Sequence, residues 1–157
     1  MGRMGFTRGF LVAVAIALIF SATSLSSELP TSDVRVELSA GTPPSLHVTI
    51  RSRAEVQVSF FKWRLPWGDR NTMILVAVAP DGSQIHRNIP IDDPPPERIS
   101  VGPNESLSGD VSLEKAFTSL DAALKKSDIH LFWAYKCPKE LNIGQWAGGW
   151  ILIPQQK

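Results

Sequence analysis

The side chains with the most chemical promise lie in a short segment that contains two tryptophans. Trp63 and Trp67 flank Arg64-Leu65-Pro66, and Gly68-Asp69-Arg70 follows. Tryptophan and arginine supply much of the binding energy at protein interfaces, and the proline and glycine around Trp67 indicate a loop. We therefore expect a partner-binding surface made by Trp63, Arg64, Trp67 and Arg70. The alternative is that Trp67 folds back as a lid on the core.

Three further tryptophans lie in the C-terminal part of the chain, at Trp133, Trp146 and Trp150. A tryptophan in a predicted strand is usually a core residue, so we expect Trp133 and Trp150 to be buried. Exposed, coplanar rings among Trp63, Trp67 and Trp146 would instead favour a glycan-binding module. A glycan-binding module is therefore the second functional hypothesis.

Recognisable catalytic motifs are missing from the sequence. His47, His86 and His130 are far apart, and none has a second ligand at zinc-site spacing. The sequence contains no nucleophile elbow, phosphate-binding loop or dinucleotide fingerprint. Asp92, Asp93 and Glu97 offer oxygen ligands for calcium, but the prolines between them favour a solvated loop. We predict no catalytic residue, no metal site and no cofactor; an enzyme of unrecognised type is the third hypothesis.

The first 27 residues have the pattern of an export signal. Arg3 and Arg8 precede an apolar run from residue 10 to residue 20, which is followed by small polar residues. This run is too short to cross a bilayer as a helix, which needs about 20 apolar residues. We therefore expect residues 1–27 to be a cleaved signal peptide, the mature protein to be secreted or periplasmic, and no permanent membrane span.

Residues 28–157 are expected to form a single domain, since their number suits one core and not two. The whole chain has 16 basic and 15 acidic residues, which argues against a nucleic-acid partner, because binding phosphates requires a local excess of Lys and Arg. Cys137 is the only cysteine and precludes an internal disulfide. Strand alternation predicts that its thiol is buried and slow to react.

Hydrophobic periodicity predicts short strands separated by turns. Residues 34–38, 46–50, 107–113 and 129–135 alternate clearly, and residues 84–90, 99–101 and 146–153 complete the set. Residues 73–78 are continuously apolar, which predicts a central strand covered on both faces. Residues 55–63 change parity near Phe60, which predicts a β-bulge. We expect an all-β, immunoglobulin-like antiparallel β-sandwich with one short helical turn within residues 112–126.

Several short motifs resemble the immunoglobulin-like pro-domain of deuterolysin-type metallopeptidases. They are the segments 61–66, 101–106 and 110–113 together with Ala116-Phe117, and the resemblance extends over about residues 33 to 136. Those peptidases carry a zinc-binding His-Glu-x-x-His helix after the pro-domain, and this sequence contains no such motif. The resemblance implies a secreted sandwich that packs against another protein, without peptidase activity. We therefore predict an exported, non-catalytic protein that binds another protein.

Overall fold

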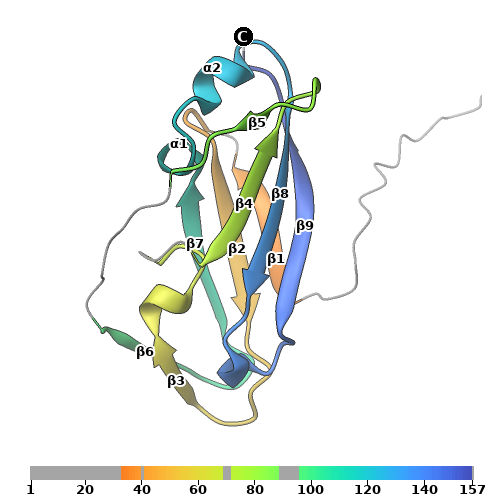
Figure 1. The fold of residues 1–157 in the computed structure, drawn as a ribbon. Helices are drawn as coiled ribbons and strands as arrows, with labels where there is room; N and C mark the ends of the chain where they lie inside the picture. Colours follow the sequence, from red (N-terminus) through yellow and green to blue (C-terminus); the bar gives the residue numbers. More distant parts are fainter. Residues whose placement is uncertain (1–32, 40, 69–71, 89–95, 157) are drawn as a thin grey trace, which may run out of the picture.

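Figure 1 shows a computed structural model of the protein, which describes residues 33–39, 41–68, 72–88 and 96–156. The predicted signal peptide lies outside these ranges. So do Arg70, from the predicted binding segment, and Asp92 and Asp93, from the acidic loop. The structure therefore does not test these predictions.

The described part of the chain forms three antiparallel sheets. The first has the order β1-β2-β7 (Val34–Ser39, Ser45–Arg51 and Ser106–Ser112). The second has the order β5-β4-β8-β9 (Gln84–Ile85, Met73–Val78, Ile129–Lys136 and Trp146–Ile153). A third sheet pairs β3 (Val58–Phe61) with β6 (Arg98–Val101). In Figure 1 the four-stranded sheet lies in front of the three-stranded sheet, so that the two form the layers of a sandwich.

The core lies between these layers and is built from alternate residues of each strand. Leu46, Val48 and Ile50 of β2 are almost fully buried, as are Leu131 and Tyr135 of β8. Successive side chains of a strand point to opposite faces, so each strand contributes every second residue to the core. Burial of each such aliphatic side chain contributes about 1.5–3 kcal/mol. The all-β antiparallel sandwich predicted from alternation is therefore the observed fold.

The parity change near Phe60 has a different cause from the predicted β-bulge. Strand β3 ends at Phe61, and a 3-10 helix, η1 (Lys62–Arg64), begins immediately after it. Helical backbone rotates successive side chains by a different angle from strand backbone. The shift of Trp63 relative to the buried Phe60 follows from that change of backbone. The β-bulge prediction is wrong.

Two short helices occupy the interval in which one helical turn was predicted. They are α1 (Leu113–Ala116) and α2 (Leu120–Leu124). The Ser112 hydroxyl accepts a hydrogen bond from the Lys115 N–H at 3.3 Å and so caps α1. Their buried side chains join the core. In Figure 1 both helices lie at the same end of the sandwich, which they close. A second 3-10 helix, η2 (Lys139–Leu141), follows β8.

Strand β4 differs from its prediction in one respect. It occupies an interior position between β5 and β8, as expected for a central strand. Met73, Leu75 and Ala77 are buried in the core, but Ile74 is 49% exposed and Val76 37% exposed. The prediction that both faces of this strand are covered is wrong, because its outer face is open. That face belongs to the candidate site described below.

The buried position of Cys137 is confirmed. The residue follows β8 and is 4% exposed. Burial raises the pKa of its thiol from 9.0 to about 11, although a backbone hydrogen bond partly opposes that shift. Only the thiolate is a good nucleophile, so this side chain is an inert part of the core at neutral pH.

Candidate functional site

The predicted binding segment begins with a small aromatic cluster. The ring of Trp63 stacks on Phe61, with the ring centroids 5.9 Å apart and an angle of 14° between the planes. The Arg98 guanidinium lies 5.0 Å from the centre of the Phe61 ring, within the range of a cation–π contact. Trp63 is half-buried. Its indole therefore packs against its own domain.

Arg64 connects the same segment to two other elements. Its Nη1 donates to both carboxylate oxygens of Glu140 in η2, at 2.8 and 2.9 Å. Its backbone carbonyl accepts hydrogen bonds from the Tyr135 hydroxyl at 3.0 Å and from the Thr72 hydroxyl at 3.3 Å. Both side chains of the ion pair are less than one-third exposed. Arg64 therefore fastens η1 to the end of the four-stranded sheet.

Trp67 covers the backbone of β7 at a glycine. A Cβ atom added to Gly109 would lie 2.4 Å from Cδ2 of the Trp67 indole, so the ring sits directly against this position. Gly109 is paired with the buried Val48 and faces inward. Trp67 is half-buried and packs against the core cluster. This is the lid arrangement that the sequence left as an alternative.

A second surface, not selected from the sequence, is the outer face of β4, β8 and β9. We call it the open face. It is formed by the outward-facing residues Ile74, Val76, Val78, His130, Phe132, Ala134, Lys136, Trp146, Gly148, Trp150 and Leu152. These alternate with residues that point into the sandwich. Only His130 and Lys136 in this set are ionisable.

Large apolar side chains on the open face are in contact with solvent. The exposed fractions are 47% for Phe132, 52% for Trp146, 53% for Trp150 and 43% for Leu152, besides those of Ile74 and Val76 given above. Contiguous apolar patches on soluble monomers rarely exceed about 300–600 Å² and are often functional. Six large, exposed apolar side chains gathered on one face are typical of a contact surface.

The strand register arranges these side chains in rows. Val76, Phe132 and Trp150 are direct cross-strand neighbours and form one row of bulky groups. Ala134 and Gly148 are paired in the adjacent row, which is shallow over β8 and β9. Residues two apart on one strand are separated by about 7 Å. Over β8 and β9, the ridge of Phe132 and Trp150 therefore lies beside a lower row of small residues, Ala134 and Gly148, which we call the hollow.

The outer face of the other sheet has the opposite character. Its outward positions carry Arg35, Glu37, His47, Thr49, Arg51 and Asp110, with serines between them. The His47 Nδ1 atom lies 2.8 Å from the Asp110 carboxylate, and both side chains are exposed. A sheet with one face in water normally has such polar outward residues. The apolar open face is therefore specific to the four-stranded sheet.

The two predicted core tryptophans lie on opposite faces of this sheet. Trp133 points inward and is half-buried; a Cβ added to its cross-strand partner Gly149 would lie 3.2 Å from the indole. Trp150 pairs with Phe132 and points outward, so the prediction of its burial is wrong. The His130 ring lies 6.0 Å from the Trp150 ring. Trp133 and Trp150 face opposite sides of the sheet because they belong to consecutive cross-strand pairs, Trp133 with Gly149 and Phe132 with Trp150.

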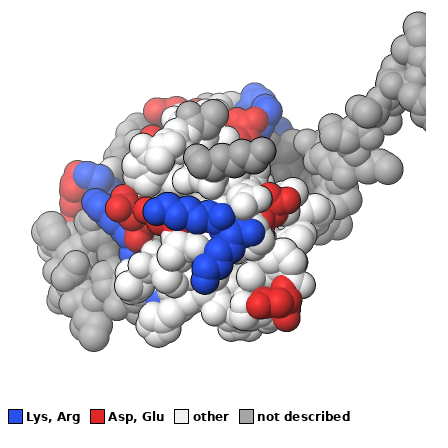
Figure 2. Space-filling model, turned by 90° about the horizontal axis from the view of Figure 1, so that it is seen from above, with Lys and Arg blue, Asp and Glu red and all other residues white. Residues whose placement is uncertain are grey.

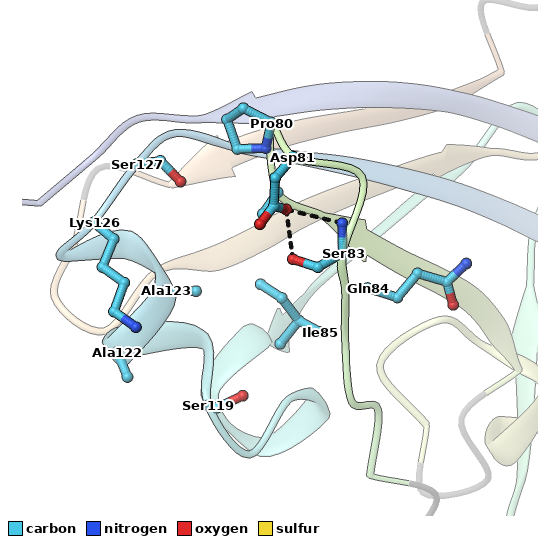
Figure 3. Close-up of a pocket in the computed structure, with 11 residues that line it drawn as sticks. Pro80, Asp81, Ser83, Gln84, Ile85, Ser119, Ala122, Ala123, Lys126 and Ser127 are labelled. Carbon is cyan, nitrogen blue, oxygen red and sulfur yellow. Dashed lines mark hydrogen bonds between the residues drawn. The ribbon is translucent and has the colours of Figure 1, made fainter.

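The end of the molecule that carries α2 has a pocket of about 480 Å³, which lies between α2 and the turn after β4. Figure 3 shows Asp81 on one side and Lys126 on the other, with small side chains such as Ala123 between them. The Asp81 carboxylate accepts hydrogen bonds from the N–H and hydroxyl of Ser83, at 2.9 and 2.6 Å. These bonds lower the pKa of Asp81. The carboxylate therefore serves the turn.

The described part of the chain shows neither a metal-binding cluster nor a membrane-spanning helix. Within residues 33–39, 41–68, 72–88 and 96–156, no group of three His, Cys, Asp or Glu side chains is placed to hold a metal ion. No helix in these ranges is both long and apolar enough to span a bilayer. Seen from the α2 end, charged side chains of both signs are interspersed (Figure 2).

The open face left two signals in the sequence. One is the unbroken apolar run of β4, and the other is Trp150 in phase with Gly148 and Trp146. The sequence predicts burial for the β4 run and for Trp150, and an exposed ring at Trp146 only under the glycan hypothesis, because a single sequence does not tell which side of a sheet is covered. No protein-family model, no curated protein and no solved structure matches the chain.

Proposed function

We propose that the protein is an exported, non-catalytic β-sandwich that binds another protein through the open face. The observation that carries this proposal is the unbroken row Val76, Phe132 and Trp150, which lies exposed across three adjacent strands. Aromatic side chains are enriched at interface centres, and charged residues are depleted there. The open face has that composition, with Lys136 and His130 in its outermost rows.

The contact surface proposed from the sequence is less favoured. Trp63, Arg64 and Trp67 each have a partner within the domain: Phe61, Glu140 and Gly109 respectively. Binding through these side chains would compete with contacts that hold the fold. Phe132 and Trp150, in contrast, present their surface to solvent. We therefore transfer the main contact from residues 63–70 to the open face.

A glycan is the second candidate ligand, because Trp146 and Trp150 are both exposed on the same side of β9. Aromatic rings stack well on sugar rings, but specific sugar binding also needs polar groups for the hydroxyls. The residues between and beside these rings are mostly apolar: Gly148, Ala134 and Phe132. The polar neighbours are Lys136, which pairs with Trp146, and His130, whose ring lies 6.0 Å from that of Trp150. A protein partner, which buries aliphatic and aromatic surface together, suits this face better.

Site-specific photo-crosslinking tests the proposal. A photoreactive phenylalanine analogue replaces Phe132 in one variant and Thr49, on the polar outer face of the other sheet, in a matched control. Both variants are expressed with the export signal and irradiated in the native compartment. We expect a discrete protein adduct from position 132 and none from position 49. Equal labelling from both positions, or no adduct from position 132, contradicts the proposal. Loss of the adduct after glycosidase treatment favours a glycoconjugate.

A further inference from the structure

We infer that the open face binds a second copy of the same chain, in a symmetric dimer that packs sheet on sheet. This inference rests on the proposed function, since it names the occupant of the same surface. The predicted complex contains two copies of the chain, related by a two-fold axis. Its support comes from the shape, the charge and the size of the face.

Over β8 and β9, the shape of the open face is complementary to itself. The ridge residues Phe132 and Trp150 lie one row away from the hollow residues Ala134 and Gly148, on the same two strands. Consider a two-fold axis in the plane of contact that crosses the strands between these rows. It brings Phe132 over Ala134 of the second copy and Trp150 over Gly148 of the second copy. An isologous contact requires such pairing of a surface with itself.

The charge distribution permits this pairing. The row with the bulky groups and the row with the hollow contain no ionisable side chain. His130 and Lys136 lie in the rows above and below them, at the border of the contact. A different protein that recognised this face by charge would need charged side chains in its central rows. Two identical uncharged faces can pair without them. Like charges placed opposite each other would cost several kcal/mol, and the two central rows avoid that cost.

The size of the face sets the strength expected of the dimer. We take about 600 Å² per copy as the area available for contact, the upper end of the apolar patches found on monomers, because six large apolar side chains of the open face are 37–53% exposed. A dimer would then bury about 1,200 Å² in total, at the lower end of specific interfaces. Two sandwiches packed in this way would align their sheets at about 30° and about 10 Å apart. We therefore expect a reversible dimer with a dissociation constant on the order of micromolar.

Sedimentation velocity on the purified exported protein, over a concentration range from about 1 to 300 μM around that value, measures the dimerisation. We expect a concentration-dependent shift from monomer to dimer. Phe132→Asp should weaken the dimer at least tenfold. Val56→Asp is the matched control, because Val56 is apolar and 68% exposed but lies in the loop before β3; this variant should dimerise like the wild type. Circular dichroism confirms that each variant is folded.

Ala134→Leu separates specific pairing from general stickiness. This substitution adds apolar surface to the open face but fills the hollow that receives Phe132 of the second copy. Self-complementary packing predicts dimerisation at least tenfold weaker than that of the wild type. A merely sticky face predicts stronger association, and that result would overturn the inference.

The dimer and the broader proposal fail separately. A wild-type protein that stays monomeric throughout the concentration range overturns the dimer. If photo-crosslinking from position 132 still gives a discrete adduct of different mass, binding through the open face stands with another protein as occupant. If the protein is monomeric and position 132 gives no adduct, both are contradicted. A crosslinked dimer of the chain from position 132, together with monomeric sedimentation of Phe132→Asp, supports the dimer.

Discussion

The indole of Trp67 takes the place that a side chain at position 109 would occupy. Trp67 follows η1, while Gly109 lies in β7, an edge strand of the three-stranded sheet. The missing side chain lets the ring rest on the strand and seal that edge of the sandwich. A glycine in a strand often marks such a close approach.

Gly109→Ala should destabilise the protein. The new Cβ would lie 2.4 Å from Cδ2 of Trp67, so the indole or the strand must move. Overpacking of this kind costs about 1–3 kcal/mol. Urea unfolding measures the change in the free energy of unfolding. Gly41→Ala is the control, because its Cβ would meet only the Pro43 carbonyl oxygen at an ordinary 3.6 Å. Equal stability of the two variants would contradict the lid contact.

The ion pair between Arg64 and Glu140 should make stability depend on pH. Partial desolvation raises the pKa of the Glu140 carboxyl, but a backbone hydrogen bond and Arg64 outweigh it, so that the pKa falls below 4.5. A lowered folded-state pKa gives stability that is present above the unfolded-state value and lost as the pH falls through the folded-state value. We expect Glu140→Gln to cost about 1 kcal/mol at pH 7.

The same substitution should cost little below the folded-state pKa, because the carboxyl is then protonated in both states. Unfolding curves of the wild type and of Glu140→Gln between pH 7 and pH 3 test this. Glu105→Gln is a control on an exposed carboxylate that bonds only within its turn, to the Gly102 N–H. A Glu140→Gln penalty that stays constant down to pH 3 would rule out the ion pair as its source.

The Cys137 thiol should be alkylated slowly in the native protein. With a pKa of about 11, its thiolate fraction at pH 8 is about one hundredth of that of an ordinary cysteine. Reaction with iodoacetamide should therefore be at least about 100-fold slower than in urea-unfolded protein. Mass spectrometry follows the modification. Rapid native modification, or a covalent dimer that disappears on reduction, would point to an accessible thiol instead.

The sequence predicted the layers of the sandwich better than it predicted the surface. Alternation in β1, β2 and β8 was decisive, because burial on one side of a sheet imposes a two-residue period. Continuous hydrophobicity in β4 has two explanations: burial on both faces, or an apolar outer face. The two explanations differ in whether another element packs over Ile74 and Val76. The local sequence does not contain that information.

The sequence left the role of the loop residues undecided for a related reason. Trp67 in a Pro- and Gly-rich segment has the same sequence signature whether its ring binds a partner or rests on Gly109. The deciding contact joins residues 67 and 109, which are distant in the sequence. The pairing of Arg64 with Glu140 is likewise a contact between distant segments. Such contacts depend on the tertiary fold, and composition does not predict them.

Hydroxyl-radical footprinting tests the central claim, that binding covers the open face, most directly. The oxidation of Phe132, Trp146 and Trp150 is measured by mass spectrometry in the native exported compartment and in dilute purified protein. We predict that these three residues are protected in the native compartment, whereas Val56, exposed away from the open face, is oxidised equally in both samples. Equal oxidation of Phe132 and Trp150 in the two samples would contradict the claim, whatever the partner.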